Sequence, residues 1–191
     1  MKLFLIRHGQ TTANAEKFYA GQSDVPLTEQ GRREAEQIRP ILAPIPFDRV
    51  YSSDLSRAIH TQQLALPGYT ARTTPLLREF DLGALVGQPV GTALQDMDPA
   101  RRAARDYTVF GGENAAMVRS RVEKFLQQLL ADPCENVAAF CHNGIMSCTM
   151  QLVLGEAADP SAMRSKNCAI NVFEHDGTKW RLLAWNYMGT V

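Results

Sequence analysis

The sequence predicts an α/β fold, a three-layer sandwich in which a mostly parallel sheet carries helices on both faces and an inserted lid segment. Short apolar runs alternate with segments of helical periodicity along most of the chain. The first apolar run stops abruptly at Arg7 and His8. Near the other end, two β-rich runs flank Asp176-Gly177, a dipeptide that favours a hairpin turn. Together these observations predict parallel strands joined by helices, followed by an antiparallel hairpin.

The first forty residues predict a strand, a loop and a helix. Residues 3–9 form an apolar run that is too short for a helix, so they are expected to form a buried strand that ends at the cation and the imidazole. Residues 10–24 are polar and contain glycine, which favours a loop over the strand end. Thr28 is the expected N-cap of the next helix, which Pro40 should end or kink.

The middle of the chain predicts a second strand and helix and then an irregular excursion. Residues 47–53 resemble a strand, residues 55–66 a helix, and residues 73–80 a short strand or extended piece. Four glycine and proline positions follow, and an alanine-rich, charged stretch at 94–107 suits one or two helices. We expect residues 81–112 to be the insertion or lid.

The last third predicts two helices, a buried strand and the hairpin. Apolar residues recur at helical spacing over 114–130, and 145–154 reads as an apolar helix. Between them, the run V-A-A-F-C at 137–141 is typical of a buried strand. The hairpin strands are expected at 169–173 and 181–185.

Composition limits the classes of protein and partner. At 191 residues, the chain fits one domain over residues 1–191. Its 20 basic and 20 acidic residues balance without blocks of one sign, which argues against nucleic acid or an anionic membrane as a main partner. No apolar stretch reaches membrane-spanning length, the first residues lack the layout of a signal peptide, and the four cysteines form no C-x-x-C pair. We therefore expect a cytoplasmic protein with reduced thiols.

Several polar residues are predicted to meet at one edge of the sheet. Right-handed crossovers place the carboxyl ends of parallel strands on the same side, where open α/β sheets bind ligands. The residues at these ends are Arg7, His8, Ser52, Ser53 and His142, with Arg57 just beyond in a helix start. An isolated R-H-G matches by accident, so Arg7 as a surface cation and His8 as a loop histidine remain the alternative from this motif alone.

Six blocks, in order along most of the chain, resemble the histidine phosphatases, the phosphoglycerate mutase-like superfamily. The blocks are L-I-R-H-G-Q-T-T-A-N (5–14), G-Q-S-D-V-P-L-T-E-Q-G (21–31), Y-S-S-D-L-S-R-A-I-H-T (51–61), L-R-E-F-D-L-G (77–83), G-G-E-N (111–114) and C-H-N-G (141–144). The resemblance implies a phosphomonoesterase that forms a covalent phosphohistidine on His8. One ring nitrogen must be unprotonated, with the other held by a backbone carbonyl.

The same resemblance assigns roles to the other candidates. Arg7 and Arg57 would bind the phosphate oxygens, and His142 would be a further donor, either protonated or at least donating. Asn14 would add a neutral hydrogen bond. Glu79 matches the position of the general acid, which later acts as a base on water.

Two of these assignments have structural alternatives. Glu79 could instead pair with Arg78 or another cation. Arg57 could be a solvated charge in the first turn of a helix, although the helix dipole disfavours a cation there and a phosphate would relieve the misfit. No metal and no cofactor are expected, because the histidines are scattered and the phosphohistidine route needs no cation.

The resemblance leaves the phosphate acceptor open. Cofactor-dependent mutases carry a tyrosine and then a lysine after the acid, where this chain has Leu82 and Val90, so the phosphatase branch is favoured. Many phosphatase relatives have Trp-Glu where this chain has Leu85-Val86, which leaves the substrate class undetermined beyond a small phosphorylated metabolite. Mutase-type transfer and a non-catalytic phospho-ligand binder on the same fold remain alternatives. The hairpin edge could support a homodimer or simply face solvent.

Overall fold

The computed structural model of the protein describes residues 1–155 and 164–189. Its six-stranded sheet has the order β3-β2-β4-β1-β5-β6. The first four of these strands are parallel to one another, and β5 and β6 run antiparallel as the predicted hairpin. The mostly parallel sheet is therefore confirmed. The strands are β1 (Lys2–Arg7), β2 (Arg49–Ser53), β3 (Arg72–Thr74), β4 (Asn136–Cys141), β5 (Ile170–His175) and β6 (Trp180–Tyr187).

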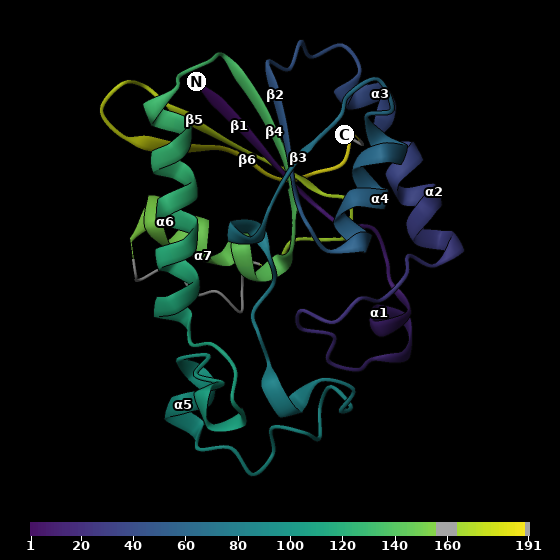
Figure 1. Ribbon diagram of the computed structural model, residues 1–191, viewed down its shortest axis with the longest axis vertical. Coiled ribbons are helices and arrows are strands. Elements are labelled where there is room, and N and C mark those ends of the chain that lie inside the picture. The colour runs from purple at the N-terminus through teal and green to yellow at the C-terminus, as the bar shows by residue number, and fades with distance from the viewer. Residues whose placement is uncertain (156–163, 190–191) are drawn as a thin grey trace.

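Helices cover both faces of the sheet, which confirms the three layers (Figure 1). Successive side chains of a strand point to opposite faces, so Leu3 and Leu5 pack with the residues of α6 and α7, whereas Ile6 packs with those of α2 to α4. The helices are α1 (Thr12–Glu16), α2 (Glu29–Gln37), α3 (Arg39–Leu42), α4 (Ser56–Ala65), α5 (Pro99–Ala103), α6 (Ala115–Ala131) and α7 (Asn143–Leu154).

The predicted helix signals around α2 are confirmed. The Thr28 hydroxyl accepts a hydrogen bond from the Gly31 amide at 3.0 Å and caps the helix. The helix ends at Gln37, and a separate short helix, α3, begins at Arg39 with Pro40 in its first turn. Proline thus divides the segment because its ring blocks a continuous helix.

One local prediction needs correction and another is confirmed. The expected loop at 10–24 contains α1, because Thr11 and Asn14 form a capping box in which each side chain bonds the other residue's amide. The stretch at 94–107, predicted to hold one or two helices, contains one, the five-residue α5, capped by Asp98 and closely followed by Arg105 in the left-handed region at φ 51°. Its alanines favour a helix, but the chain turns away before a second one forms.

The segment 73–80, predicted as a short strand or extended piece, begins within the three-residue β3. β3 ends at Thr74, and a 3₁₀ turn over Pro75–Leu77 follows. Thr74 caps this turn through its side chain, which accepts from the Leu76 amide. The segment then runs extended into Glu79 without joining the sheet. Glu79 therefore lies outside the sheet, on the segment that follows this turn.

The inserted segment 81–112 is fastened to the rest of the chain at two places. At its neck, Asp81 and Glu113 exchange hydrogen bonds of 2.9 Å, and a Cβ on Gly83 would lie 1.9 Å from the Phe110 carbonyl oxygen. Farther out, the stretch at 87–90 bonds to the stretch at 17–19 through backbone contacts such as Gly87 N to Tyr19 O at 2.8 Å. The insertion thus forms a rim below the sheet (Figure 1); its movement as a lid stays a prediction.

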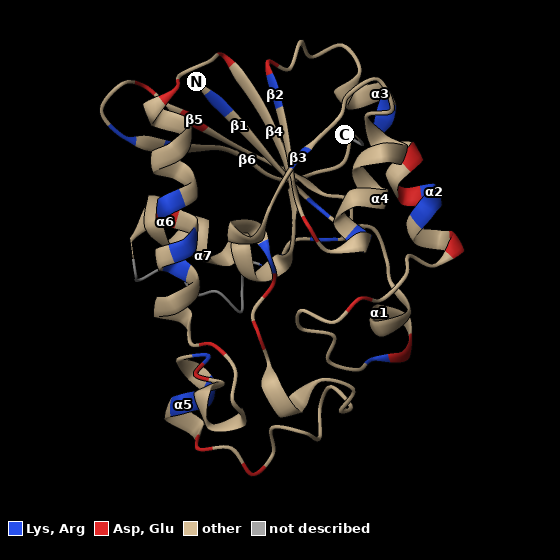
Figure 2. Ribbon diagram, in the orientation of Figure 1, with Lys and Arg blue, Asp and Glu red and all other residues tan. Residues whose placement is uncertain are grey.

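Acidic and basic residues alternate along surface helices such as α2 (Figure 2). Among the described residues, no helix is long and apolar enough to cross a membrane.

Candidate active site

His8 directly follows β1 and is held in one orientation. The residue is 5% exposed, and its Nδ1 lies 2.8 Å from the Gly9 carbonyl oxygen. The Gly9 amide donates to the Thr61 hydroxyl at 3.0 Å, and that hydroxyl donates to the Arg57 carbonyl at 2.7 Å. Burial, reinforced by Arg57 and Arg7, holds the pKa of His8 well below its usual range. The ring is therefore neutral, with its proton on Nδ1 and a free lone pair on Nε2.

His142 lies beside His8 because of the register of the sheet. Arg7 is opposite Cys141 in the parallel pair β1–β4, so the residues that follow each strand are neighbours, with ring centroids 5.1 Å apart. The Arg57 Nε donates to His142 Nδ1 at 3.2 Å. Since a guanidinium can only donate, Nδ1 is unprotonated and Nε2 carries the hydrogen of a neutral ring.

The electrostatics of His142 agree with that tautomer. Burial, followed by the charge of Arg57, lowers its pKa well below the usual value. Its Nε2 is buried and has no hydrogen-bond partner among the described residues. Of the two states expected for His142, the geometry favours the neutral donor over the imidazolium, with its N–H available to a ligand.

Arg57 is a buried cation rather than a solvated one. The residue is 2% exposed, and its Nη1 and Nη2 donate to the carbonyls of Ser23 and Gly21 at 2.8 and 2.7 Å. Burial lowers its pKa to about 10. The solvated-charge alternative for this helix start is therefore wrong.

Arg7 occupies the end of β1 on the same sheet edge. Its Nη1 donates to the Ser165 carbonyl, and burial lowers its pKa. Its Nε is buried and lacks a partner within the described part of the chain. A buried donor without an acceptor is costly. Within the described chain, Arg7 and His142 therefore offer two free N–H donors at one edge of the sheet. An anion bound there would accept from both.

Glu79 reaches the same edge from outside the sheet. Its carboxylate accepts from the Phe80 amide at 2.9 Å and from the Gly144 amide, in the first turn of α7, at 3.1 Å. Arg78 pairs with Asp54 at 2.7 Å instead of with Glu79, so the Arg78 part of that alternative is wrong. A Cβ on Gly144 would lie 2.0 Å from Glu79 Oε1. The glycine of C-H-N-G thus permits the carboxylate to approach the helix start.

Asn14 lies at the margin of this group. Its side-chain oxygen accepts from Thr11 in the α1 capping box and from Asn167 Nδ2 at 3.3 Å. Asn167 also donates to the His8 carbonyl at 2.9 Å. Asn14 is thereby connected to the loop that carries His8, and its contact with phosphate stays a prediction.

Several supporting residues were not predicted from the sequence. Thr61 had a usable signal, because it lies four residues after Arg57 and so on the same face of α4. Ser165 and Asn167 had none, since they sit in a loop that no periodicity identifies. Arg121 was not predicted either, because in the sequence it is one of several charged residues on an amphipathic helix.

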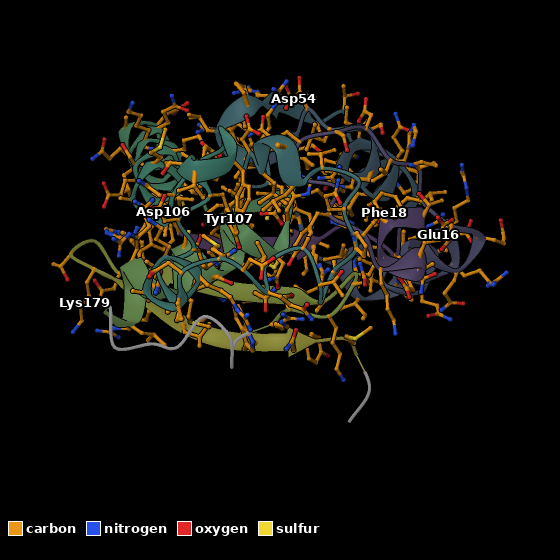
Figure 3. The ribbon with its side chains drawn as sticks, turned by 90° about the horizontal axis from the view of Figure 1, so that it is seen from below. Glu16, Phe18, Asp54, Asp106, Tyr107 and Lys179 are labelled. Atoms are coloured by element: carbon orange, nitrogen blue, oxygen red, sulfur yellow. The ribbon has the colours of Figure 1, made fainter. Side chains whose placement is uncertain are left out.

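The rim adds aromatic and cationic side chains near Glu79. The Arg105 guanidinium lies 4.2 Å from the centre of the Phe80 ring, which contacts Tyr107 edge-on at 5.8 Å. Arg101, also in the rim, forms an ion pair with Asp106 at 2.9 Å. Seen from below, Phe18 lies on one side of this end of the molecule, with Asp106 and Tyr107 on the other (Figure 3).

Neutral, oriented histidines among buried arginines at the carboxyl edge of an α/β sheet define a protein that handles phosphate groups. The chain belongs to the histidine phosphatase superfamily (branch 1), whose family model matches residues 3–188. Membership supports an enzyme that hydrolyses phosphate esters.

Relatives with both mutase and phosphatase names are similar to the chain. A probable phosphoglycerate mutase, GpmB, from Proteus mirabilis is 29% identical over 97% of this chain and 90% of its own. A mycobacterial glucosyl-3-phosphoglycerate phosphatase, solved with VO3, has a TM-score of 0.86 and 28% identity over 97% of this chain and 98% of its own. The α-ribazole phosphatase of Shigella flexneri has a TM-score of 0.84 and 26% identity over 98% and 97%.

Proposed function

We propose that the protein is a metal-independent phosphomonoesterase that hydrolyses a small phosphorylated metabolite through a phosphohistidine on His8. The observation that carries the proposal is the fixed tautomer of His8, whose Nδ1 is held by the Gly9 carbonyl at 2.8 Å. A neutral imidazole approaches an anionic ester without charge repulsion. The buried, unpartnered N–H groups of Arg7 and His142 supply donors for the phosphate oxygens.

In the first step, His8 Nε2 attacks phosphorus and the ester P–O bond breaks. The leaving oxygen takes a proton from Glu79 in its acid form, which becomes a carboxylate. Arg7, Arg57 and His142 stabilise the charge on the oxygens that stay with phosphorus. The products of this step are an alcohol and the phosphohistidine.

In the second step, water attacks the phosphorus of the phosphohistidine while the Glu79 carboxylate takes a proton from it. The P–N bond breaks, its electron pair returns to Nε2, and inorganic phosphate leaves. Glu79 ends in the acid form with which the cycle began, so protons balance. The cycle consumes one water and requires no other reactant.

Phosphate release from a panel of phosphomonoesters, with and without chelator, tests the proposal. We expect turnover that survives chelator, an acid-labile phosphoenzyme, and loss of both in His8→Ala by at least about 10³-fold, because the nucleophile is removed. A wild-type protein that forms no phosphoenzyme on any substrate contradicts the proposal.

Mutase-type transfer is the second candidate, favoured by the GpmB relatives. The chain has Leu82, which is buried, and Val90, which is 47% exposed, at the places that the mutase resemblance gives to a tyrosine and a lysine. Neither side chain can bind a carboxylate. Efficient interconversion of phosphoglycerates with little hydrolysis would establish this candidate instead.

A further inference from the structure

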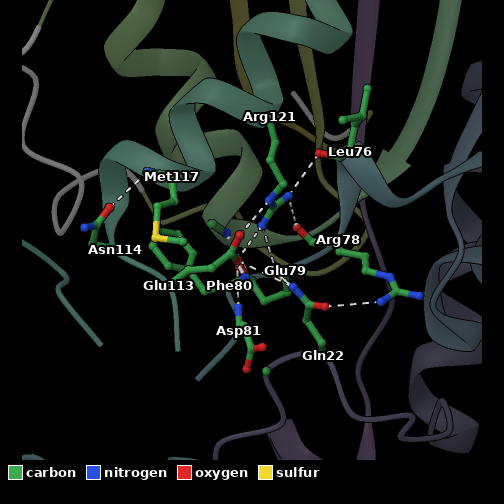
Figure 4. A network of polar contacts seen from close by, with 12 residues as sticks. Gln22, Leu76, Arg78, Glu79, Phe80, Asp81, Glu113, Asn114, Met117 and Arg121 are labelled. Carbon is green, nitrogen blue, oxygen red and sulfur yellow. Dashed lines mark hydrogen bonds and ion pairs between the residues drawn. The ribbon is translucent and has the colours of Figure 1, made fainter. Parts of the chain in front are cut away.

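We propose that Arg121, together with Glu113, is a positioning residue that sets the location of Glu79 for proton transfer. The inference rests on the proposed function and extends it to a residue outside the phosphate site. Arg121 lies on α6, and Glu79 lies on the extended segment after the 3₁₀ turn. Figure 4 shows the Arg121 guanidinium between Leu76, Arg78, Glu79 and Glu113.

All five N–H groups of Arg121 are used within this network. Nη1 donates to the Leu76 and Arg78 carbonyls at 3.0 and 2.9 Å, and Nη2 donates to the Glu79 carbonyl at 3.2 Å. Nε and Nη2 also bond the two oxygens of Glu113 at 2.9 and 2.8 Å. Because a guanidinium has five donors, none remains for a phosphate. Arg121 therefore acts on the backbone of the segment that carries the acid.

Glu113 connects this network to the neck of the insertion. Its Oε2 accepts from the Asp81 amide at 2.9 Å, two residues after Glu79. Arg121 and Glu113 are 18% and 15% exposed, so their pairing is largely shielded from solvent. Glu79 thus lies between one backbone anchor at Arg121 and another at Glu113.

Gln22 provides a third anchor from the segment between α1 and α2. Its amide nitrogen donates to the Glu79 carbonyl at 3.1 Å, and its oxygen accepts from Arg78 at 3.3 Å. Among the described residues, the Glu79 carboxylate accepts only from the backbone amides of Phe80 and Gly144. Such amides would donate to a carboxylate in a range of positions, so these contacts do not by themselves fix where Glu79 lies. The backbone anchors are thus what sets the position of Glu79, and a displacement of about 1 Å can lower a rate by about 10²-fold.

The dependence on leaving group distinguishes a positioned acid from general structural support. An alkyl phosphate needs a proton on its leaving oxygen, whereas 2,4-dinitrophenolate leaves without one. The test is to compare first-turnover release of the leaving group from an alkyl phosphate and from 2,4-dinitrophenyl phosphate. Thermal unfolding of each variant is monitored in parallel. The variants are Arg121→Gln and Glu113→Gln.

We expect Arg121→Gln to slow release from the alkyl phosphate by about 10²-fold and from the dinitrophenyl ester by less than about threefold. Glu113→Gln should slow the alkyl phosphate selectively as well, by a smaller factor. It replaces Arg121→Gln as the test if that variant does not fold. Arg49→Gln is the matched control: Arg49 is a shielded arginine paired with Asp132, at the start of β2 away from the site, and its removal should spare both substrates.

Equal losses on both esters, or no loss on either in a folded variant, overturn the positioning role while leaving the phosphohistidine step intact. A wild-type protein that forms no phosphoenzyme is a different result, which removes the proposed function itself. The two failures are therefore distinguishable within one set of measurements.

Discussion

Arg57 connects the two histidines of the site through one side chain and one backbone group. Its Nε fixes the tautomer of His142 at 3.2 Å, and its carbonyl accepts from Thr61, which orients the peptide that holds His8. A lysine could not do this, because its single ammonium lacks the fixed fork of donors. Arg57 therefore prepares both rings, in addition to its proposed contact with phosphate.

Gly144→Ala is expected to impair catalysis through Glu79. The new methyl group would lie 2.0 Å from Glu79 Oε1 and 2.6 Å from the Phe80 ring, so the carboxylate must move. We expect kcat on alkyl phosphates to fall by about 10²-fold with inhibition by vanadate nearly unchanged, because displacement of the acid spares the oxygen-binding donors. Steady-state kinetics measure both quantities.

Ser147→Ala is the control for this substitution. Ser147 lies one turn farther along α7 and bonds the Asn143 carbonyl at 3.0 Å, without contact to Glu79. Its kinetics should resemble those of the wild type. A Gly144→Ala protein with unimpaired turnover of alkyl phosphates would show that the carboxylate tolerates the shift.

The candidate catalytic residues at the strand ends were predictable from the sequence, whereas the residues that orient them were not. His8, Arg7 and His142 follow recognisable apolar runs, so the sheet edge could be predicted. The bonding of Arg121 could not, because three of its five hydrogen bonds go to backbone carbonyls that have no sequence signature. The neutral state of His142 likewise depends on a tertiary contact with Arg57.

The loop after His8 and the start of α2 depend on glycine for close backbone packing. A Cβ on Gly31, in the first turn of α2, would lie 2.0 Å from the Gln10 carbonyl oxygen, and one on Gly9 would lie 2.3 Å from the Gly31 carbonyl oxygen. α2 therefore packs directly against the loop that follows His8.

Gly31→Ala is expected to lower the free energy of unfolding by about 2 kcal/mol or more, because the backbone must separate to admit the methyl group. Gly68→Ala is the matched control, since a Cβ there meets nothing within 4 Å. Denaturant unfolding measures both. Equal stability of the two variants would mean that the α2 contact adapts at little cost.

Regular elements were more predictable than the insertion. Apolar periodicity locates α4, α6 and α7 within a few residues, most clearly in α6, which buries one apolar face and is capped by Asn114. The insertion follows no period, and its course is set by the pairing of 87–90 with 17–19 and by the neck at Asp81. Such contacts join distant segments and cannot be inferred from local pattern.

At the scale of the whole molecule, the two buried histidines should make stability depend on pH. Their folded pKa values lie below the unfolded value of 6.5, so under acidic conditions the unfolded chain binds more protons and stability falls as pH falls. Between pH 6.5 and about 5.5, each histidine should account for a loss of about 1 kcal/mol.

Urea unfolding of the wild type and of a His8→Gln/His142→Gln variant measures this effect. The variant should lose about 2 kcal/mol less than the wild type over this interval. An identical pH dependence in both proteins would show that neither ring stays neutral in the folded state.

The central place of β1 in the sheet has a consequence for the order of events during synthesis. Its two neighbours, β4 and β5, come about 130 and 170 residues later in the chain. At about 5 to 20 residues per second, β5 leaves the ribosome roughly 10 to 30 s after β1. Until β4 has emerged, β1 has neither of its sheet neighbours and its Leu3 and Leu5 face lacks α7, so the nascent chain is exposed to aggregation or chaperone capture. The edge that carries His8 and His142 can form only after β4 has been translated.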